Sequence, residues 1–287
     1  MSKEIDDFKN VVFDFEALDV CPFCQCAVMV PNGKIKWLDI DMWYVFCNGC
    51  GLKFMNPRPT QQSYKDFYKN LFWQQKIRNL GSHFEGQMWQ AKKYKWDNEE
   101  SWDPAEGVKN RMDKQREQKT KDIIKALDAA TSLTAQSAVI DVGCSFGVTL
   151  DEIYKKYHCH VYGIEPSDET QKEIAKFEQI KMLGHYAEEL EDISKTELKF
   201  DVIIFSHVLE NTTDPINVIN FAKRCLKPTG FIYIQTPNLL VFDQMNPYHP
   251  YIFSRNSLKV LAEKCQLRYK QISESKNKML EVLLLNQ

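Results

Sequence analysis

The sequence predicts an α/β fold in its C-terminal half, with a mostly parallel sheet covered by helices, and a small metal-binding module before it. Three observations predict this. From residue 138 onward, strand patterns alternate with helix patterns, as in the βα units of parallel sheets. A glycine turn follows the first of these strands, and two Cys-x-x-Cys pairs stand near the N-terminus. A chain of 287 residues is long enough for one sizeable core and a smaller appendage.

The predicted elements of the C-terminal half follow one another closely. Strands are expected at AVIDV, HVYGIE, a short third segment, FDVIIFS and GFIYIQT. Helices are expected from the glycine turn to residue 156, over SDETQKEIAKF and over DPINVINFAKRCL. A helix over 254–265 and the strands LRYKQISES and MLEVLLLN complete the pattern. Because a tight hairpin joins antiparallel strands, one strand of the sheet is expected to run against the others.

The chain divides into three predicted parts. Residues 1–60 show short strands and turns around the cysteine pairs, 61–135 form a helical linker or lid, and 136–287 form the α/β domain. Ten aromatic residues interleaved with Lys and Arg lie between 64 and 102. They fit a lid over a substrate and a packing layer between the flanking parts equally well. The helix expected over 109–125 carries seven Lys or Arg, for which a solvated face is the default interpretation.

Composition argues against several classes of protein. The net charge of −2 and the pI near 6.3 oppose a nucleic-acid partner, because proteins that bind phosphate backbones are generally basic. No stretch approaches the ~18 apolar residues of a membrane span, and the first ten residues lack the apolar core of an export signal. We therefore expect a cytoplasmic protein with reduced cysteines. The pattern specifies no oligomeric state.

Four cysteines have the spacing of metal ligands. Cys21 and Cys24 form one Cys-x-x-Cys pair, and Cys47 and Cys50 form a second pair 22 residues further on. This is close to the spacing of zinc ribbons, in which four thiolates close a tetrahedron around a structural Zn²⁺. Two redox-active pairs are the alternative, but neither pair follows a βαβ pattern. Cys26, just beyond the first pair, is left out of the predicted ligand set.

An acid and two glycines mark the first turn of the α/β domain. Asp141 stands near the end of AVIDV, and Gly143 and Gly147 follow at plus two and plus six. This spacing differs from the dinucleotide fingerprint, so the backbone is expected to approach a ligand without cradling a pyrophosphate. Glu165 ends the next strand, where α/β nucleotide folds place a carboxylate on ribose hydroxyls. Together the two acids favour the cationic S-adenosylmethionine over an anionic nucleotide.

Residues 138 to about 275 resemble class I S-adenosylmethionine-dependent methyltransferases. The segments similar to motifs of that family are, in order, VIDVGCSFG, IEPS, FDVIIFSHVLEN with the DP after it, CLKPTGFIYIQTPN and HPYIFSRNSLKVLAEKCQL. The N-terminal CPFC and CNGCGLKFMNPRPT resemble the zinc-ribbon extension of one bacterial subgroup. The resemblance covers most of the chain outside roughly 65–130. It implies a Rossmann-like sheet, S-adenosylmethionine as cofactor and methyl transfer as the reaction.

The resemblance also implies which residues contact the cofactor. The glycine turn would pack against its methionine and ribose, with Asp141 orienting the loop, and Glu165 would hold the ribose hydroxyls. Two residues after the third strand would flank the adenine, and the end of the fourth strand would face the sulfonium. The implied set is Asp141, Gly143, Cys144, Gly147, Glu165, Ala187, Glu188 and Ser206.

Three residues are candidates for catalysis. His207 ends the fourth strand, at the sheet edge where open α/β folds bind ligands, and His249 lies in an aromatic loop. A base is needed only for a protonated hydroxyl, amide or carbon acid, and a plain structural role is an equally good interpretation of each histidine. The subgroup usually has a histidine where this sequence has Asn211. If that histidine is the family base, another residue must serve here or no base is needed. Asn211 is expected to orient an acceptor hydroxyl. The remaining histidines singled out, His158, His160 and His185, are expected to be scaffold.

The leading functional prediction is methyl transfer to a small molecule. A sugar or sugar phosphate in a surface-glycan or secondary-metabolite pathway is favoured, because the zinc-ribbon subgroup often resembles such enzymes. An RNA methyltransferase that positions RNA with its zinc ribbon is one alternative, which the acidic pI opposes. A catalytically silent binding protein is another, and Asn211 is its only support.

Overall fold

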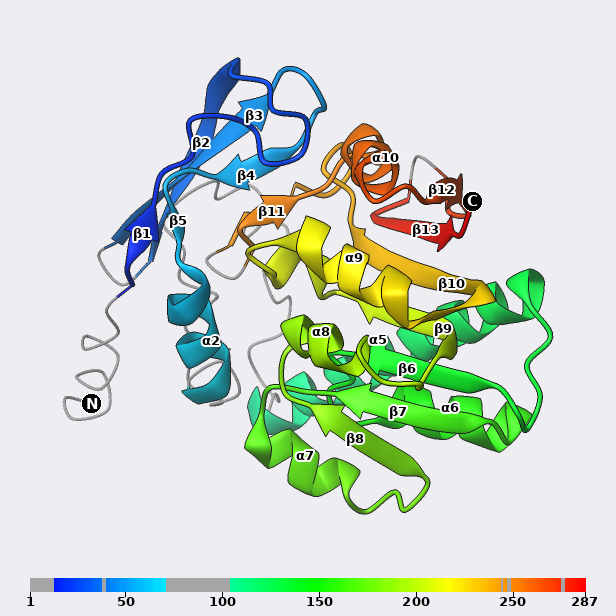
Figure 1. Cartoon of the computed structure of the whole chain (residues 1–287). Helices are drawn as coiled ribbons and strands as arrows, with labels where there is room; N and C mark the ends of the chain where they lie inside the picture. Colours follow the sequence, from blue (N-terminus) through cyan, green and yellow to red (C-terminus); the bar gives the residue numbers. More distant parts are fainter. Residues whose placement is uncertain (1–12, 38–39, 71–103, 244, 247–248, 275–276) are drawn as a thin grey trace.

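The computed structural model describes residues 13–37, 40–70, 104–243, 245–246, 249–274 and 277–287. Within these residues, seven strands form the central sheet in the order β12-β13-β10-β9-β6-β7-β8 (Figure 1). Each strand of this sheet matches a segment that the sequence pattern predicts. Their bounds are β6 Ala138–Val142, β7 His160–Ile164, β8 Ile180–Gly184, β9 Phe200–Ser206, β10 Leu226–Pro237, β12 Arg268–Gln271 and β13 Met279–Leu285.

The direction of the strands also agrees with the prediction. The five strands from β8 to β10 pair in parallel, whereas β13 runs antiparallel to both β10 and β12. All five residues of β6 are buried, as are six of the seven residues of β9. A strand covered on both faces must be apolar along its whole length, which explains why AVIDV and FDVIIFS read as continuous runs. The predicted α/β fold is therefore confirmed.

Alternate residues of the central strands supply two separate cores. On one face, Ile140 and Ile203 pack with apolar residues of α8, α9 and α10. On the other face, Val139 and Val202 pack with residues of α5, α6 and α7. This division follows from the two-residue period of a strand. The helices run over α5 Pro104–Ala130, α6 Val148–Tyr157, α7 Asp168–Ile174, α8 Leu190–Ile193, α9 Pro215–Cys225 and α10 Arg255–Lys264.

A second, smaller sheet holds the N-terminal module together. Among the described residues its strand order is β11-β4-β3-β2, and a separate short pair joins β1 to β5. Strand β11 comes from the far end of the chain, between β10 and α10, and pairs antiparallel with β4 (Figure 1). The bounds are β1 Phe15–Glu16, β2 Met29–Trp37, β3 Ile40–Cys47, β4 Lys53–Met55, β5 Arg58–Pro59 and β11 Tyr251–Ile252.

Contacts between the two parts extend beyond this strand pair. The rings of Phe23 and Tyr251 stack at 5.8 Å between centroids. The side chain of Lys53 is completely buried and its Nζ lies 2.7 Å from Asp243, in the loop after β10. The Arg58 guanidinium donates to the backbone oxygen of Thr213 and to the Tyr251 hydroxyl. The N-terminal module therefore packs directly on the loops at one end of the central sheet.

The region between the two sheets is helical where the structure describes it. Helix α2, Gln61–Asn70, follows β5 directly, and α5 extends further in both directions than the predicted 109–125. Most of the aromatic segment 64–102 lies outside the described residues. None of the helices described here is long and apolar enough to cross a membrane.

Candidate active site and four-cysteine cluster

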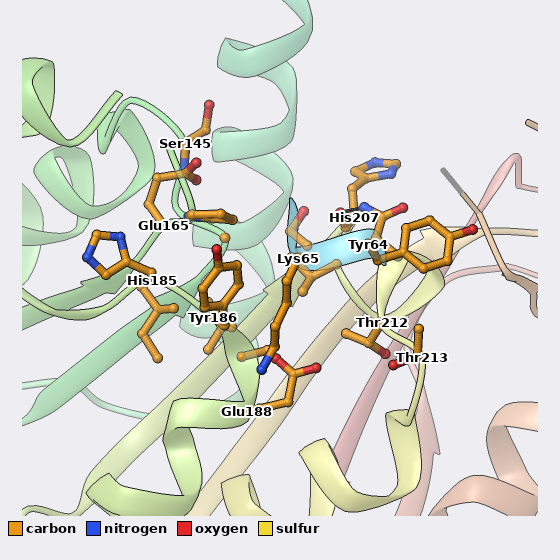
Figure 2. Close-up of a pocket in the computed structure, with 18 of the residues that line it drawn as sticks. Tyr64, Lys65, Ser145, Glu165, His185, Tyr186, Glu188, His207, Thr212 and Thr213 are labelled. Atoms are coloured by element: carbon orange, nitrogen blue, oxygen red, sulfur yellow. Dashed lines mark hydrogen bonds between the residues drawn. The ribbon is translucent and has the colours of Figure 1, made fainter. Parts of the chain in front are cut away.

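A cavity of about 310 Å³ lies at the carboxyl ends of β6, β7 and β9. This is the place where the strand order reverses, and open α/β sheets bind ligands there. Figure 2 shows Glu165, His185 and Tyr186 at one end of it, His207, Thr212 and Thr213 at the other, and Lys65 between them. The lining is Gln61, Tyr64, Lys65, Lys119, Val142, Gly143, Ser145, Ile164, Glu165, Pro166, His185, Tyr186, Ala187, Glu188, Ser206, His207, Val208, Asn211, Thr212 and Thr213.

The floor of the cavity is the turn between β6 and α6. Gly143 has φ of 75°, and a Cβ atom there would lie 2.5 Å from Cγ2 of Val208. Gly147 has φ of 74° and forms the N-cap of α6. Both positions need glycine because residues with a side chain rarely adopt this left-handed backbone conformation. The backbone is thereby left open toward the cavity.

Asp141 is a buried acid beneath this turn. Its side chain is 1% exposed, and its Oδ1 has no hydrogen-bond partner among the described residues. Burial raises the pKa of Asp141 to about 7; the charge of Lys119 opposes this shift and that of Glu165 adds to it. A buried carboxylate oxygen without a donor is costly. Asp141 is therefore a position that a bound cation would stabilise.

Glu165 connects the glycine turn to the start of α7. It is 2% exposed, its Oε2 accepts a hydrogen bond of 2.9 Å from the amide of Ser145, and its Oε1 accepts one of 3.1 Å from the amide of Ser167. These bonds fix the carboxylate at the cavity wall. An ionised carboxylate only accepts hydrogen bonds, about four in all. The Glu165 side chain is therefore suited to ligand hydroxyls.

Helix α2 covers one end of the cavity. Gln61 Nε2 donates to Glu188 Oε1 at 2.8 Å, and Lys65 Nζ lies 5.3 Å from the centre of the Tyr186 ring. Glu188 belongs to the short 3-10 helix η1, Ala187–Glu189. These contacts place a helix of the N-terminal part over the β8 side of the site.

His207 lies at the opposite end with an unusual backbone conformation. Its φ is 59°, its amide donates to Gln235 O at 2.8 Å, and its carbonyl accepts from Asn211 Nδ2 at 2.9 Å. Its ring Nδ1 lies 3.2 Å from Oε1 of Glu210, in the 3-10 helix η2, Leu209–Asn211. Positive φ is uncommon outside glycine and often marks functional sites. These contacts fix the position of the imidazole.

The structure brings most of the predicted site residues to the cavity. Of the predicted cofactor set, Gly143, Glu165, Ala187, Glu188 and Ser206 line it, as do His207 and Asn211. Asp141, Cys144 and Gly147 lie in or beneath the glycine turn without lining the cavity. Cys144 is buried, and its Sγ would be 2.7 Å from a Cβ placed on Gly163. Burial raises the pKa of its thiol well above the usual range.

His249 lies outside the cavity lining. It is 9% exposed and its Nδ1 is 3.0 Å from the side-chain nitrogen of Asn246. By contrast, His185 lines the cavity although the sequence favoured a scaffold role for it. Its Nδ1 lies 3.0 Å from the side-chain nitrogen of Gln171 on α7. Its cavity position could have been predicted from the sequence, because it lies two residues before Ala187 and Glu188, the pair predicted to flank the adenine.

Lys119 is a cavity residue that sequence reasoning missed. It comes from α5, whose basic residues were interpreted as a solvated face, yet its Nζ donates to Ser206 O at 3.3 Å. That interpretation is wrong for Lys119, while Glu117 and Gln118 beside it are exposed. Helical periodicity could have separated Lys119 from its neighbours, because it lies one turn before the buried Ile123 and two turns before the buried Leu127.

The four predicted metal ligands meet in one cluster. The Sγ atoms of Cys21, Cys24, Cys47 and Cys50 all lie within 4.8 Å of one another. The Cys21–Cys50 distance is 3.6 Å and the Cys24–Cys47 distance is 3.4 Å. Tetrahedral Zn²⁺ with bonds of about 2.3 Å separates its sulfur ligands by about 3.8 Å. The predicted clustering is confirmed, and Cys26 stays outside the set as expected.

Comparisons with known proteins agree with this architecture. A family profile described as a methyltransferase domain matches residues 112–272, more than half of the chain. A ubiquinone biosynthesis O-methyltransferase of Haemophilus ducreyi is 35% identical over 108 residues, which are 35% of this chain and 45% of that protein. The corresponding protein of Actinobacillus pleuropneumoniae is 33% identical over 109 residues, with the same coverage. The chain thus spans about half the length of the curated relatives it matches.

A solved structure matches over a larger part of the chain. The magnesium protoporphyrin IX methyltransferase of Synechocystis, with bound SAH, superposes with a TM-score of 0.52 at 12% identity. The match covers 79% of this chain and all of that one. At this identity the likeness shows the fold alone.

Proposed function

The chain belongs to the methyltransferase-domain family, and we propose that it is an S-adenosylmethionine-dependent methyltransferase that methylates a hydroxyl group of a small polar molecule. A sugar or sugar phosphate is the favoured acceptor. The observation that carries the proposal is the end of the cavity that His207 lines together with Asn211, Thr212 and Thr213. This is a set of proton acceptors and hydrogen-bond partners suited to a hydroxylated molecule.

The cavity fits S-adenosylmethionine by the chemistry of its side chains. Asp141 has a buried oxygen that lacks a donor among the described residues, which suits a cationic ligand. Glu165 suits the ribose hydroxyls, and Lys119 supplies a positive charge for the ligand's carboxylate. The turn at Gly143 leaves no room for a side chain, so the ligand would meet bare backbone there. Ala187 and Glu188 would border the adenine.

The residues of this chain have three tasks in the proposed reaction. The bound cofactor supplies a methyl group on a sulfonium, which is already activated for displacement. The protein must therefore hold the acceptor in line and exclude water, which can contribute roughly 7 to 11 kcal/mol. His207 would take the hydroxyl proton on Nε2, and Asn211 would orient the hydroxyl. Helix α2, which bears Tyr64 and Lys65, would help to exclude water.

Two other functions are weaker candidates. A structured RNA substrate would need phosphate contacts, and the net charge of −2 opposes them. The O-methyltransferases among the relatives instead support an oxygen acceptor. A silent binding protein would not require the cavity to bind S-adenosylmethionine, so the affinity for this ligand separates it from an enzyme.

A screen of hydroxylated acceptors tests the proposed function. Purified protein is incubated with S-adenosylmethionine and a panel of sugars, sugar phosphates, phenols and structured RNA, and the release of S-adenosylhomocysteine is measured. We expect release with one of the small hydroxylated acceptors and little dependence on ionic strength. Release with RNA alone, falling steeply as salt rises, would favour the RNA alternative.

We also propose that the four-cysteine cluster binds a structural Zn²⁺. The sulfur distances of 3.4 and 3.6 Å support a closed tetrahedral site. Metal binding requires the deprotonated thiolates and releases their protons, so the affinity of this cluster for Zn²⁺ should fall as the pH falls. None of the nine cysteines forms a disulfide, which suits the reducing environment of a cytoplasmic protein.

Replacing Glu165 tests the cofactor site. Glu165→Ala is expected to weaken S-adenosylmethionine binding by roughly 1.5 to 3 kcal/mol, the range for hydrogen bonds to a charged group. Titration calorimetry measures the change, and thermal melting checks that the protein stays folded. Glu173→Ala is the matched control, because Glu173 is a half-exposed acid on α7 that does not line the cavity. Wild-type affinity in Glu165→Ala would remove Glu165 from the site.

The raised pKa of Asp141 predicts a pH dependence of cofactor binding. Its carboxyl group, with a pKa of about 7, is mostly protonated at pH 5.5 and half ionised at pH 7. The ligand's ammonium group favours the ionised form, so affinity should rise by about tenfold over this interval. In the protein without ligand, the stability of the fold changes with pH in the opposite direction to the affinity. The native state holds a proton that the unfolded state has lost, so this group lowers stability as the pH rises from about 4 to 7.

Titration calorimetry at several pH values measures this dependence. Asp141→Asn should bind S-adenosylmethionine with an affinity that changes little between pH 5.5 and 7. A steep rise that persists in Asp141→Asn would assign the dependence to another group.

A further inference from the structure

A buried carboxylate contacts the imidazole of His207. Glu210 is 1% exposed and does not line the cavity. Its Oε1 lies 3.2 Å from Nδ1 of His207, and its Oε2 accepts a hydrogen bond of 3.0 Å from the Thr236 hydroxyl on β10. Both carboxylate oxygens are therefore engaged, and one of them is engaged by the imidazole.

The charge of Glu210 determines the direction of the hydrogen bond with His207. Burial by itself would raise its pKa, but the hydrogen bond from His207 and the charges of His207 and His249 outweigh burial, so the net pKa lies below the usual range. Glu210 is thus a carboxylate at neutral pH. A carboxylate only accepts hydrogen bonds, so Nδ1 of His207 must carry the hydrogen. When the His207 ring is neutral, its other nitrogen, Nε2, then keeps its lone pair.

The backbone on both sides of His207 is fixed independently of Glu210. The amide of His207 is bound by Gln235 and its carbonyl by Asn211. A left-handed conformation at a non-glycine residue is strained and persists only when its surroundings hold it. Here that conformation occurs where the chain leaves β9, and it accompanies a His207 that lines the cavity and whose ring contacts Glu210.

We propose that Glu210 is a positioning residue that holds His207 in the Nδ1–H tautomer and leaves Nε2 ready to accept the acceptor's proton. The inference deepens the proposed function and rests on it for the role of Nε2. Other charged groups near this pair are Lys119 on α5, which binds Ser206 O, and His249 before β11. Among the described residues, the side-chain hydrogen bond given for the His207 ring is the one to Glu210, so the assignment falls on Glu210.

The tautomer of His207 is measured directly by NMR on the resting full-length protein. The six histidines are labelled with ¹⁵N, and long-range proton–nitrogen spectra are recorded near pH 8, where an ordinary imidazole is neutral. The His207 signals are assigned by their absence from His207→Gln. Glu210→Met removes the carboxylate acceptor at similar side-chain length, and Glu210→Gln replaces it with an amide that can donate or accept.

Wild-type protein should show His207 in the Nδ1–H form alone, and both Glu210 variants should show the Nε2–H form as well. Asp201→Asn is the matched control. Asp201 accepts hydrogen bonds from the Ala138 amide and Lys227 at the opposite end of β9, so its loss costs stability without reaching His207. The tautomer in Asp201→Asn should be that of the wild type.

A mixture of tautomers in the wild type would overturn the inference, as would a wild-type tautomer in both Glu210 variants. Glu210→Gln keeps the test available if Glu210→Met does not fold. Because no cofactor or acceptor is present during the measurement, a failed acceptor screen would count against the proposed function and leave this result standing.

Discussion

Replacing His207 with alanine should lower turnover by about 10²- to 10⁴-fold while the affinity for S-adenosylmethionine changes little. This is the usual contribution of a positioned general base. His207 lines the cavity at the end away from Glu165, and its ring Nδ1 lies 3.2 Å from Oε1 of Glu210. Removing it takes away the proton acceptor without touching the residues proposed to hold the cofactor. Turnover is measured with the acceptor that the screen identifies, and affinity is measured by calorimetry.

His185→Ala is the matched control for this variant. His185 also lines the cavity but lies at the end near Glu165 (Figure 2), so its loss should change cofactor affinity more than the rate of methyl transfer. If His207 only shapes the pocket, affinity and turnover should fall together and modestly. Full turnover in His207→Ala would leave His249, or no base at all, as the remaining explanation.

Replacing Cys47 with serine should release about one zinc ion per chain and unfold much of the N-terminal module. Structural zinc sites contribute about 10 to 16 kcal/mol of binding free energy that is coupled to folding. Cys47 is completely buried and is the last residue of β3. Replacing it therefore removes one of the four proposed zinc ligands at the point where the cluster joins the small sheet. Metal analysis measures the zinc, and limited proteolysis reports which part of the chain becomes accessible.

The 136–287 region should remain folded in Cys47→Ser, because the seven-stranded sheet and its helices supply most of the residues of both cores, although Cys47 itself belongs to one of them. Cys26→Ser is the matched control, since Cys26 lies beside the cluster without belonging to it. It should keep its zinc. Freshly purified wild-type protein with four free thiols and no zinc would contradict the metal proposal.

The sequence predicted the features that depend on residues close to one another in the chain. Buried parallel strands leave continuous apolar runs, so β6 and β9 were recognised, and Glu165 was found because it ends such a run. The cysteine pairs were found because a metal site fixes ligand spacing within each turn. These signals lie within a few residues of one another, where the chain geometry limits what can form.

The features that the sequence did not predict depend on contacts between distant segments. Strand β11 has two residues and joins β4 across almost 200 positions, so no local pattern marks it. Glu210 follows the apolar pair Val208-Leu209 and has the pattern of an ordinary surface acid, because its contacts with His207 and Thr236 form only in the folded chain. Lys119 was missed because it is one of several basic residues of α5, which together have the pattern of a solvated helix face. Charged residues that a fold buries are rare, and their burial is set by tertiary packing alone.

The most direct test of the central claim is transfer of a ¹³C-labelled methyl group from S-adenosylmethionine to the acceptor identified by the screen, followed by NMR of the product. A methoxy signal should grow in step with S-adenosylhomocysteine and be nearly absent with His207→Ala. A labelled methyl group on nitrogen, carbon or RNA, or none transferred to any small molecule although S-adenosylmethionine binds, would contradict hydroxyl methylation in this cavity.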